Sequence, residues 1–315
     1  MNGDAEAVRS ALPYSRPLLR TITDYVELMK PELTSLSVLT ALCSFYMAHT
    51  GTWVGSDFWL LANLALGTTL LGGGAGALNQ YIERDYDRLM KRTEKRPLPA
   101  GRLSPYSALL FGIIVSILGV LELEFFVNGL TGFLGVAILS SYLFLYTPLK
   151  RISPVATTVG GIPGALPPVM GWVAARGEIT FEPLLFFAIL FLWQMPHFFS
   201  LAWLYKKDYA RAGYKMLTVV DETGTRTSRH ILANCAALIP ISLIPSVTGI
   251  ASTTYFFGAL VAGVVFLGFG IMFAATFFTK HTDQHVRANQ LARRLFFASL
   301  VYLPSLFLLM AVDKI

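Results

Sequence analysis

The stretch WLLANLALGTTLLGGGAGAL (residues 59–78) carries no charge and leads directly into NQYIERDYDRLMKRTEKRPLPAGR (residues 79–102). With 20 residues, the first part is as long as the apolar segment that an α-helix needs to cross a bilayer. In the second part, 11 of 24 residues are charged. This abrupt change predicts a membrane-spanning helix that ends in a polar segment at the membrane boundary.

The same pattern recurs along the chain. Of its 315 residues, 54% are hydrophobic and 14% are charged, and its mean hydropathy is +0.57. A soluble domain would carry about 25% charged residues. We therefore expect an all-α polytopic membrane protein, with a nine-helix transmembrane domain at 33–311 after a polar segment at 1–32. Its expected spans are at about 33–51, 58–80, 106–123, 128–147, 154–175, 180–204, 230–250, 254–279 and 293–311.

The distribution of Lys and Arg predicts the orientation in the membrane. Nine spans put 23 of the 25 basic residues on one side, and leave only Arg176 and Lys314 on the other. By the positive-inside rule, the N-terminus and the long loops at about 81–105 and 205–229 are then cytoplasmic. Residues 1–30 lack the apolar core of a signal peptide and contain acids that a transit peptide avoids. We therefore expect a bacterial inner membrane protein.

Several other function classes find no support in the sequence. The net charge of +6 follows from the membrane topology, and no basic stretch is interleaved with aromatic residues as in a nucleic-acid-binding module. Cys43 and Cys235 lie alone in separate spans, so neither a disulfide nor a CxxC metal site is expected. His281 and His285 have helical spacing without a carboxylate framework, and we expect both to be solvated.

The first long loop begins with a pattern that suggests metal chemistry. If the second span continues as a helix through Asp87, then Asn79, Glu83 and Asp87 form one stripe of oxygen ligands along its face. Such hard ligands suit Mg²⁺, and the bases that follow suit a metal-bound polyanion such as a diphosphate. These bases are Arg88, Lys91, Arg92, Lys95 and Arg96. The alternative is an ordinary interfacial loop whose acids pair with its bases.

Two further inner connections offer residues of the same kind. Around the end of the sixth span lie Lys206, Lys207, Asp208, Arg211 and Lys215, and after the fourth span lie Tyr146, Lys150 and Arg151. Asp208 could supply another metal ligand, and the bases could hold phosphate oxygens. The sequence places all three connections on one side of the membrane.

Two features inside the spans allow two interpretations each. His197 lies in an apolar run and is either a buried histidine with a hydrogen bond or a ligand of haem iron or a proton carrier. The fifth span, TTVGGIPGALPPVMGWVAA (157–175), contains four Gly and three Pro residues. It is either a kinked, closely packed helix or irregular backbone that lines a cavity.

The chain resembles the UbiA-type intramembrane prenyltransferases, and among them the branch that farnesylates haem. The spacing of Asn79, Glu83 and Asp87, with a second acidic loop four spans later, carries the resemblance to the family as a whole. The closer resemblance rests on specific segments that run from the first span to beyond the sixth. They are KPELTSL (30–36), NQYIERDYD (79–87), RTEKRPLPAGR (92–102), YTPLKR (146–151), GGIPGALPPVMGW (160–172) and WQMPHFFSLAWLYKKDYARAGYKML (193–217).

This resemblance implies nine helices around a central cavity that opens laterally to lipid. It implies Mg²⁺-dependent transfer of a farnesyl group from farnesyl diphosphate to a vinyl group of haem b. Asn79, Glu83, Asp87 and Asp208 would hold Mg²⁺ and the diphosphate, and His197 would contact or ligate the haem. Candidates for binding the diphosphate are Lys30, Arg96, Lys150 and Arg211, with Arg151, Lys207 and Tyr146 on the same loops.

The aromatic residues of these segments could shield a carbocation with their ring faces, or simply pack in the membrane. They are Tyr146, Trp172, Trp193 and Phe198.

One departure concerns the second acidic loop. Related enzymes carry two spaced acids there, whereas Leu204 stands four residues before Asp208 and two lysines precede that aspartate. We expect lysine charge to replace part of the role of a second metal ion.

Two rival functions remain open. Another lipophilic acceptor, such as a quinone precursor, would need the same acidic stripe. An organic-anion transporter would place its polar residues nearer the bilayer midplane. The expected partners are farnesyl diphosphate, haem b and the lipid bilayer, with hand-over of product to a haem A synthase or a terminal oxidase.

Overall fold

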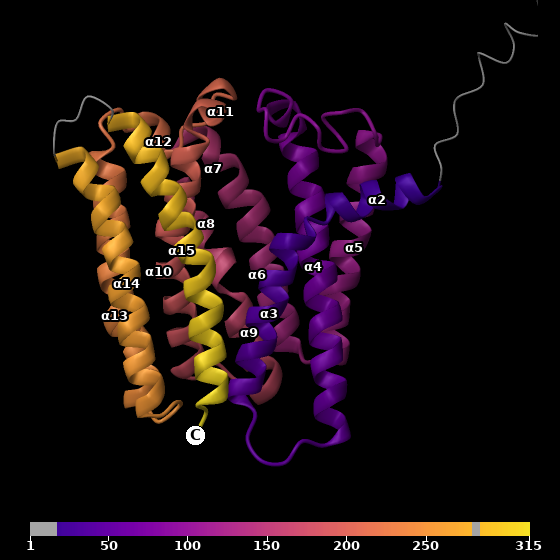
Figure 1. The fold of residues 1–315 in the computed structure, drawn as a ribbon. Coiled ribbons are helices and arrows are strands. Elements are labelled where there is room, and N and C mark those ends of the chain that lie inside the picture. Colours follow the sequence, from indigo (N-terminus) through magenta and orange to yellow (C-terminus); the bar gives the residue numbers. More distant parts are fainter. Residues whose placement is uncertain (1–17, 279–283) are drawn as a thin grey trace, which may run out of the picture.

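The computed structural model of the chain describes residues 18–278 and 284–315. Within these residues the fold is helical apart from its connections and one isolated bridge between Ala251 and Lys314 (Figure 1). The helices of the first half are α2 (Leu18–Leu28), α3 (Pro31–Ala48), α4 (Gly55–Asp87), α5 (Pro105–Phe126), α6 (Gly129–Ser140), the π-helical turn η1 (Ser141–Tyr146) and α7 (Thr147–Ile152). Those of the second half are α8 (Ala156–Ala165), α9 (Pro167–Arg176), α10 (Glu182–Leu204), α11 (Lys206–Arg211), α12 (Leu217–Val220), α13 (Thr225–Val247), α14 (Thr253–Phe278) and α15 (Gln284–Val312).

Seven helices of the described residues are long and apolar enough to cross a membrane. They correspond to all the expected spans except the first and the fifth, and α6, η1 and α7 together form the fourth. The expected count of nine spans is therefore not confirmed by length and apolarity. The first expected span is occupied by α3, which carries several Ser and Thr residues. The fifth is occupied by α8 and α9, which have 10 residues each.

The fifth expected span is interrupted between α8 and α9. Leu166 separates the two helices, and Pro167 and Pro168 follow it without backbone N–H groups to continue the ladder. The glycines of α8 also let α10 approach closely, since a Cβ at Gly161 would overlap Met195. The side chain of Gln194 donates a hydrogen bond of 2.7 Å to the carbonyl oxygen of Gly161. Interruption and close packing thus occur together in this segment.

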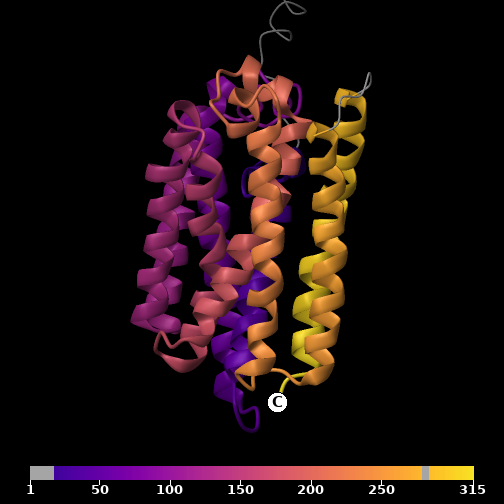
Figure 2. The same cartoon turned by 90° about the vertical axis from the view of Figure 1, so that its left-hand side faces the viewer.

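The helices of the first half and those of the last third lie on opposite sides of the bundle (Figures 1 and 2). Helix α4 packs on α5 and α3 packs on α9, while α10, α13, α14 and α15 pack on one another. Many large apolar side chains on the outside are exposed, including Ile117, Val261 and Val301. An apolar exterior is what a bilayer solvates.

The connections that carry most of the charge gather at one end of the bundle (Figure 1). The loop after α4, the end of α7 and helix α11 all lie there, whereas the C-terminus lies at the opposite end. Helix α2 lies across the bundle near the charged end. Its exposed Leu19, Ile22 and Val26 follow one another at helical spacing, while Asp24 on the other face is buried and bonds Arg102 at 2.5 Å.

Helices α9 and α3 approach each other closely at Gly171. A Cβ at this position would overlap the carbonyl oxygen of Ala41, so the glycine allows the backbones of α9 and α3 to touch. We expect Gly171→Ala to destabilise the protein by about 1–3 kcal/mol, as overpacking does. Thermal unfolding in detergent measures this change.

Gly268→Ala is the matched control for that substitution. Gly268 is also helical, but a Cβ there meets nothing within 4 Å. Alanine is the better helix former, so this variant should be as stable as the wild type or more so. Equal losses in both variants would show that the contact between α9 and α3 has no special weight.

Candidate active site

The acidic stripe lies on one face of α4, because that helix continues without a break through Asp87. Asn79, Glu83 and Asp87 recur at every fourth residue and are all buried, with 1%, 6% and 1% of their surface exposed. Asp85, on another face of the same turn, is exposed. Buried acids are costly unless they are paired, so the partners of the stripe decide what it can do.

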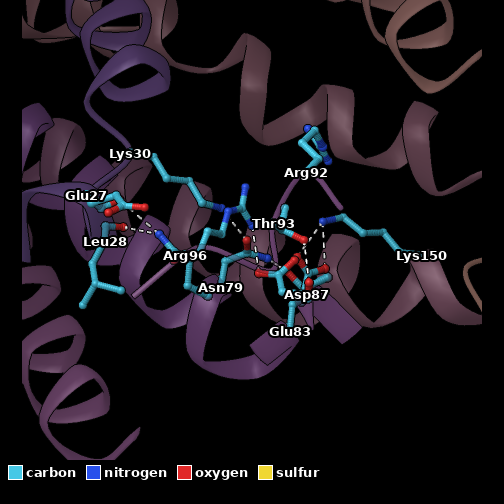
Figure 3. Close-up of polar contacts among 12 residues, drawn as sticks. Glu27, Leu28, Lys30, Asn79, Glu83, Asp87, Arg92, Thr93, Arg96 and Lys150 are labelled. Carbon is cyan, nitrogen blue, oxygen red and sulfur yellow. Dashed lines mark hydrogen bonds and ion pairs between the residues drawn. The ribbon is translucent and has the colours of Figure 1, made fainter. Parts of the chain in front are cut away.

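Each member of the stripe is bonded to a base from another segment, and Figure 3 shows these bases converging on it. Lys30 donates a hydrogen bond of 2.6 Å to Oδ1 of Asn79. Lys150 donates to both carboxylate oxygens of Glu83, at 2.8 and 3.1 Å. Arg96 donates to Oδ2 of Asp87 at 2.8 Å. The acids and bases that the sequence predicted to act together therefore form one network.

Lys30 reaches the stripe through an unusual backbone conformation. It has φ 49° and ψ 62°, and among the described residues it is the one non-glycine with positive φ. This left-handed conformation, which costs about 1–2 kcal/mol, turns the chain sharply between α2 and α3. Strain of this kind persists only where the surroundings impose it, and it is frequent at functional sites.

The surroundings that impose this turn belong to α4. A Cβ at Gly76 would lie 3.1 Å from the carbonyl oxygen of Leu28, so the glycine lets the turn approach the helix. Gln80 then donates hydrogen bonds of 3.1 and 3.2 Å to the carbonyl oxygens of Glu27 and Leu28. The glycine-rich stretch of α4 thus positions Lys30 over Asn79.

Opposing effects act on the pKa of Lys30. Burial of its ammonium group and the nearby charge of Arg96 lower its pKa to about 7, although Glu83 and Asp87 act in the opposite direction. Burial is the largest of these effects, and the acids of the stripe offset part of it.

The π-helical turn η1 brings the fourth span to the stripe. The hydroxyl of Thr147 donates to the carbonyl oxygen of Tyr142 at 2.9 Å and accepts from the amide of Asn79 at 3.2 Å. In the next turn, the ammonium group of Lys150 lies 4.5 Å from the ring centre of Tyr146. Single π-helical turns often occur where a helix must reorient functional side chains, and this one orients Thr147, Tyr146 and Lys150.

The second acidic loop contacts the first. Arg211 on α11 donates to the carbonyl oxygen of Leu89 at 3.2 Å, and Arg92 donates to the hydroxyl of Tyr209 at 3.0 Å. The backbone N–H of Lys215 donates to the carbonyl oxygen of Lys150 at 2.9 Å. All three charged connections therefore meet at one end of the bundle, whereas the sequence placed them only on the same side of the membrane.

Not every predicted residue joins the network. Asp208 is bonded to Arg211 at 2.9 Å, and the hydrogen bonds and ion pairs within 18–278 and 284–315 do not connect it to the stripe. Arg151 lies 4.4 Å from the ring centre of Tyr86, and Lys207 is exposed. Of the histidine pair in the last loop, His285 is exposed and His281 lies outside the described residues.

His197 is held between α10 and α15, apart from the acidic network. Its Nδ1 lies 2.7 Å from the hydroxyl of Ser299, and that hydroxyl donates to the carbonyl oxygen of Phe296 at 2.5 Å. A serine has one proton to donate, so Ser299 accepts from His197, and the proton of the neutral imidazole is on Nδ1. The lone pair is then on Nε2, which could bind a metal ion or a proton. Trp193 stacks on the imidazole, with 4.9 Å between ring centres.

Several residues of this site were not singled out from the sequence. Thr147 bonds Asn79, and Ser299 bonds His197. Gln80 bonds the backbone of the turn that carries Lys30, and Gly76 makes room for that turn. The run LGGGAG (71–76) was the available signal, since small residues in a membrane helix mark close approach of another backbone. Amide and hydroxyl residues give no comparable signal.

The donor set of the stripe fits Mg²⁺. This ion commonly binds one or two carboxylates together with phosphate oxygens and water, and Glu83 and Asp87 supply the carboxylates, with an amide oxygen from Asn79. Within the described part of the chain, no three His, Cys, Asp or Glu side chains lie together as a self-sufficient metal site. The ion would therefore complete its coordination with other ligands, such as phosphate oxygens.

The comparisons with known proteins agree with this geometry. The UbiA prenyltransferase family model matches residues 37–301, so the chain belongs to the UbiA prenyltransferase family. It is 44% identical over 297 residues to the protoheme IX farnesyltransferase of Solibacter usitatus, covering 92% of this chain and 98% of the relative. It is 39% identical over 309 residues to that of Koribacter versatilis, covering 98% and 99%.

Solved structures share the fold. A UbiA homologue from Archaeoglobus fulgidus bound to GPP and Mg²⁺ matches with a TM-score of 0.63 and 14% identity, covering 91% of this chain and 99% of that one. A structure of a digeranylgeranylglyceryl phosphate synthase matches with a TM-score of 0.75 and 14% identity, covering 93% and 98%. At these identities, the likeness establishes the architecture alone.

Proposed function

We propose that this chain transfers a farnesyl group from farnesyl diphosphate to a vinyl group of haem b, giving haem O. The observation that carries this proposal is the buried stripe of α4, whose members are bonded to Lys30, Arg96 and Lys150 at one end of an apolar bundle. Acids and bases together suit a metal-bound diphosphate, and the apolar helices suit the farnesyl chain and the haem. The relatives named above carry the same activity in their names.

The membrane arrangement follows from the same premises. We infer that residues 33–311 form one domain of nine crossings, with α3 and the α8–α9 pair as the first and fifth, around a central cavity. The charged end then faces the cytoplasm of a bacterium, in agreement with the positive-inside rule. Haem O would leave within the inner membrane for a haem A synthase or a terminal oxidase.

In the proposed reaction, the electron pair of the breaking C–O bond goes to the departing diphosphate. Lys30, Arg96 and Lys150 are already directed at the stripe, and their charges would stabilise the negative charge as it develops. Arg211, and more distantly Arg151 and Lys207, would contribute from the neighbouring loops. Bound at Asn79, Glu83 and Asp87, Mg²⁺ would act as a Lewis acid toward the diphosphate oxygens. Asp208 is a further candidate ligand.

The organic half of the reaction takes place among the helices. The allylic carbon bonds to the vinyl group of haem, and water then adds to the resulting cation and releases a proton to solvent. Tyr146, Trp172, Trp193 and Phe198 would shield the cations with their rings. His197, with its lone pair on Nε2, would contact or ligate the haem.

The test is an assay of the purified protein with haem b, farnesyl diphosphate and Mg²⁺, followed by mass spectrometry of the haem. We expect haem O from the wild type, and its loss when EDTA removes Mg²⁺ and its return when Mg²⁺ is added back. Product formation that persists in EDTA would contradict the metal assignment.

Two other results would redirect the proposal. If the protein binds Mg²⁺ and farnesyl diphosphate but leaves haem unchanged, its acceptor is another lipophilic molecule, such as a quinone precursor. If it binds no diphosphate, the prenyltransferase proposal fails and an organic-anion transporter becomes the better explanation.

A further inference from the structure

The side chain of Tyr214 is buried with nothing to bond. It lies in the segment between α11 and α12, and 2% of its surface is exposed. Within the described part of the chain, its hydroxyl group has no hydrogen-bond partner. Native folds rarely leave a buried hydroxyl unpaired, and the exceptions call for an explanation.

Contacts on both sides place Tyr214 beside the acidic network. Its ring centre lies 5.7 Å from that of Tyr86, the residue before Asp87 on α4. The next residue, Lys215, donates its backbone N–H to the carbonyl oxygen of Lys150 at 2.9 Å. Tyr214 therefore lies beside the C-terminal end of α4, where the stripe ends, and its neighbour in the chain is bonded to the backbone of Lys150.

Burial and the nearby negative charges act in the same direction on the pKa of the Tyr214 phenol. Burial raises the pKa of the Tyr214 phenol, and the negative charges of Glu83 and Asp87 raise it further, against the opposing charge of Lys150. The hydroxyl therefore keeps its proton at physiological pH. It is available as a hydrogen-bond donor.

The neighbouring tyrosine differs in that its hydroxyl has a partner on the first loop. The hydroxyl of Tyr209, whose ring lies 5.9 Å from that of Tyr214, already accepts from Arg92. Leu89 and Arg211 hold the two loops together nearby, so the segment that carries Tyr214 is anchored on the first loop.

We propose that the Tyr214 hydroxyl donates a hydrogen bond to a phosphate oxygen of the diphosphate substrate. This inference rests on the proposed function, because it needs a diphosphate at the stripe. A donor that stays neutral adds a directional contact without adding charge to a site that already holds several bases. This hydrogen bond would also make the second loop part of the diphosphate site, through Tyr214 rather than through Asp208.

The test compares Tyr214→Phe with Tyr255→Phe. Tyr255 is also fully buried, and its hydroxyl has no partner within the described residues, but it lies at the end of the bundle near the C-terminus. Binding of inorganic pyrophosphate in the presence of Mg²⁺ is measured by calorimetry on each purified protein. The Michaelis constants for farnesyl diphosphate and for haem b are measured alongside.

We expect Tyr214→Phe to weaken pyrophosphate binding and raise the KM for farnesyl diphosphate by about tenfold, as the loss of one hydrogen bond to a charged group does. The KM for haem b should stay unchanged and the unfolding temperature should not fall, since the lost hydroxyl bonds nothing in the described part of the protein. Tyr255→Phe should match the wild type throughout.

Pyrophosphate binding by Tyr214→Phe within about twofold of the wild type would overturn the inference and leave the proposed function intact. A lower unfolding temperature with equal losses for both substrates would also overturn it, because it would mark a structural role. If the wild type binds pyrophosphate but does not convert haem, the acceptor assignment fails and the binding comparison still decides the role of Tyr214. A wild type that binds no pyrophosphate would overturn both.

Discussion

Replacing Asp87 by Asn is expected to lower kcat/KM for farnesyl diphosphate by about 10²–10³-fold, the usual effect of removing one preorganised electrostatic contact. The carboxylate of Asp87 is 1% exposed and bonds Arg96 at 2.8 Å. Asparagine keeps the size of the side chain but removes the charge that would bind Mg²⁺ and orient Arg96. Steady-state kinetics with haem b and varied farnesyl diphosphate measure the loss.

Asp85→Asn provides a control from the same turn of α4. The side chain of Asp85 is 64% exposed, and its carboxylate lies 3.7 Å from Arg84. Exposed pairs of this kind contribute little, so activity should stay within about twofold of the wild type. Similar losses in both variants would mean that general acidity at the end of α4, rather than the position of Asp87, supports the reaction.

Lys150→Met is expected to destabilise the protein by about 3–5 kcal/mol, because it leaves the charge of Glu83 buried without its partner. The side chains of Lys150 and Glu83 are 12% and 8% exposed, and their nitrogen and oxygen atoms lie 2.8 Å apart. Methionine preserves most of the apolar stem, so lost packing contributes little. Equilibrium unfolding in mixed detergent micelles gives the free energy of unfolding.

The double variant Glu83→Gln/Lys150→Met isolates the pair. Because this variant has no unpaired carboxylate at position 83, it should recover most of the stability that Lys150→Met loses. It should be inactive. A double-mutant cycle yields the coupling energy between the two side chains. If the losses of the two single variants simply add, then Glu83 and Lys150 do not stabilise each other, and another contact joins α7 to α4.

Long apolar runs predicted the fold well because they reflect a single strong requirement. In lipid, the backbone N–H and C=O groups must bond one another, and a helix achieves this within one segment. The continuous α4 is the clearest case, since the stripe could be aligned only if the helix ran through Asp87. Amphipathic α2 was not foreseen as a helix: its 11 residues are too short to resemble a span. The α8–α9 interruption was left open, because Pro can either kink a helix or end it.

Within the site, the acids and bases were foreseen but their partners were not. Lys30 and Asn79 are 49 residues apart in the sequence, and Lys150 and Glu83 are 67 apart, so no local periodicity relates them. The turn at Lys30 depends on space that Gly76 leaves on a different helix. Tyr214 was passed over because an aromatic residue in a loop ordinarily indicates packing.

The charged network also has an order along the chain. Among the residues that the structure describes, those whose side chains bond the side chains of the stripe lie between Lys30 and Lys150, whereas His197 and Tyr214 belong to the second half. Because a chain is made from its N-terminus, these partners of Glu83 and Asp87 have all been synthesised before α10 and α11 exist. The first helices can therefore neutralise their own acids as they enter the membrane, without waiting for the helices that later enclose them.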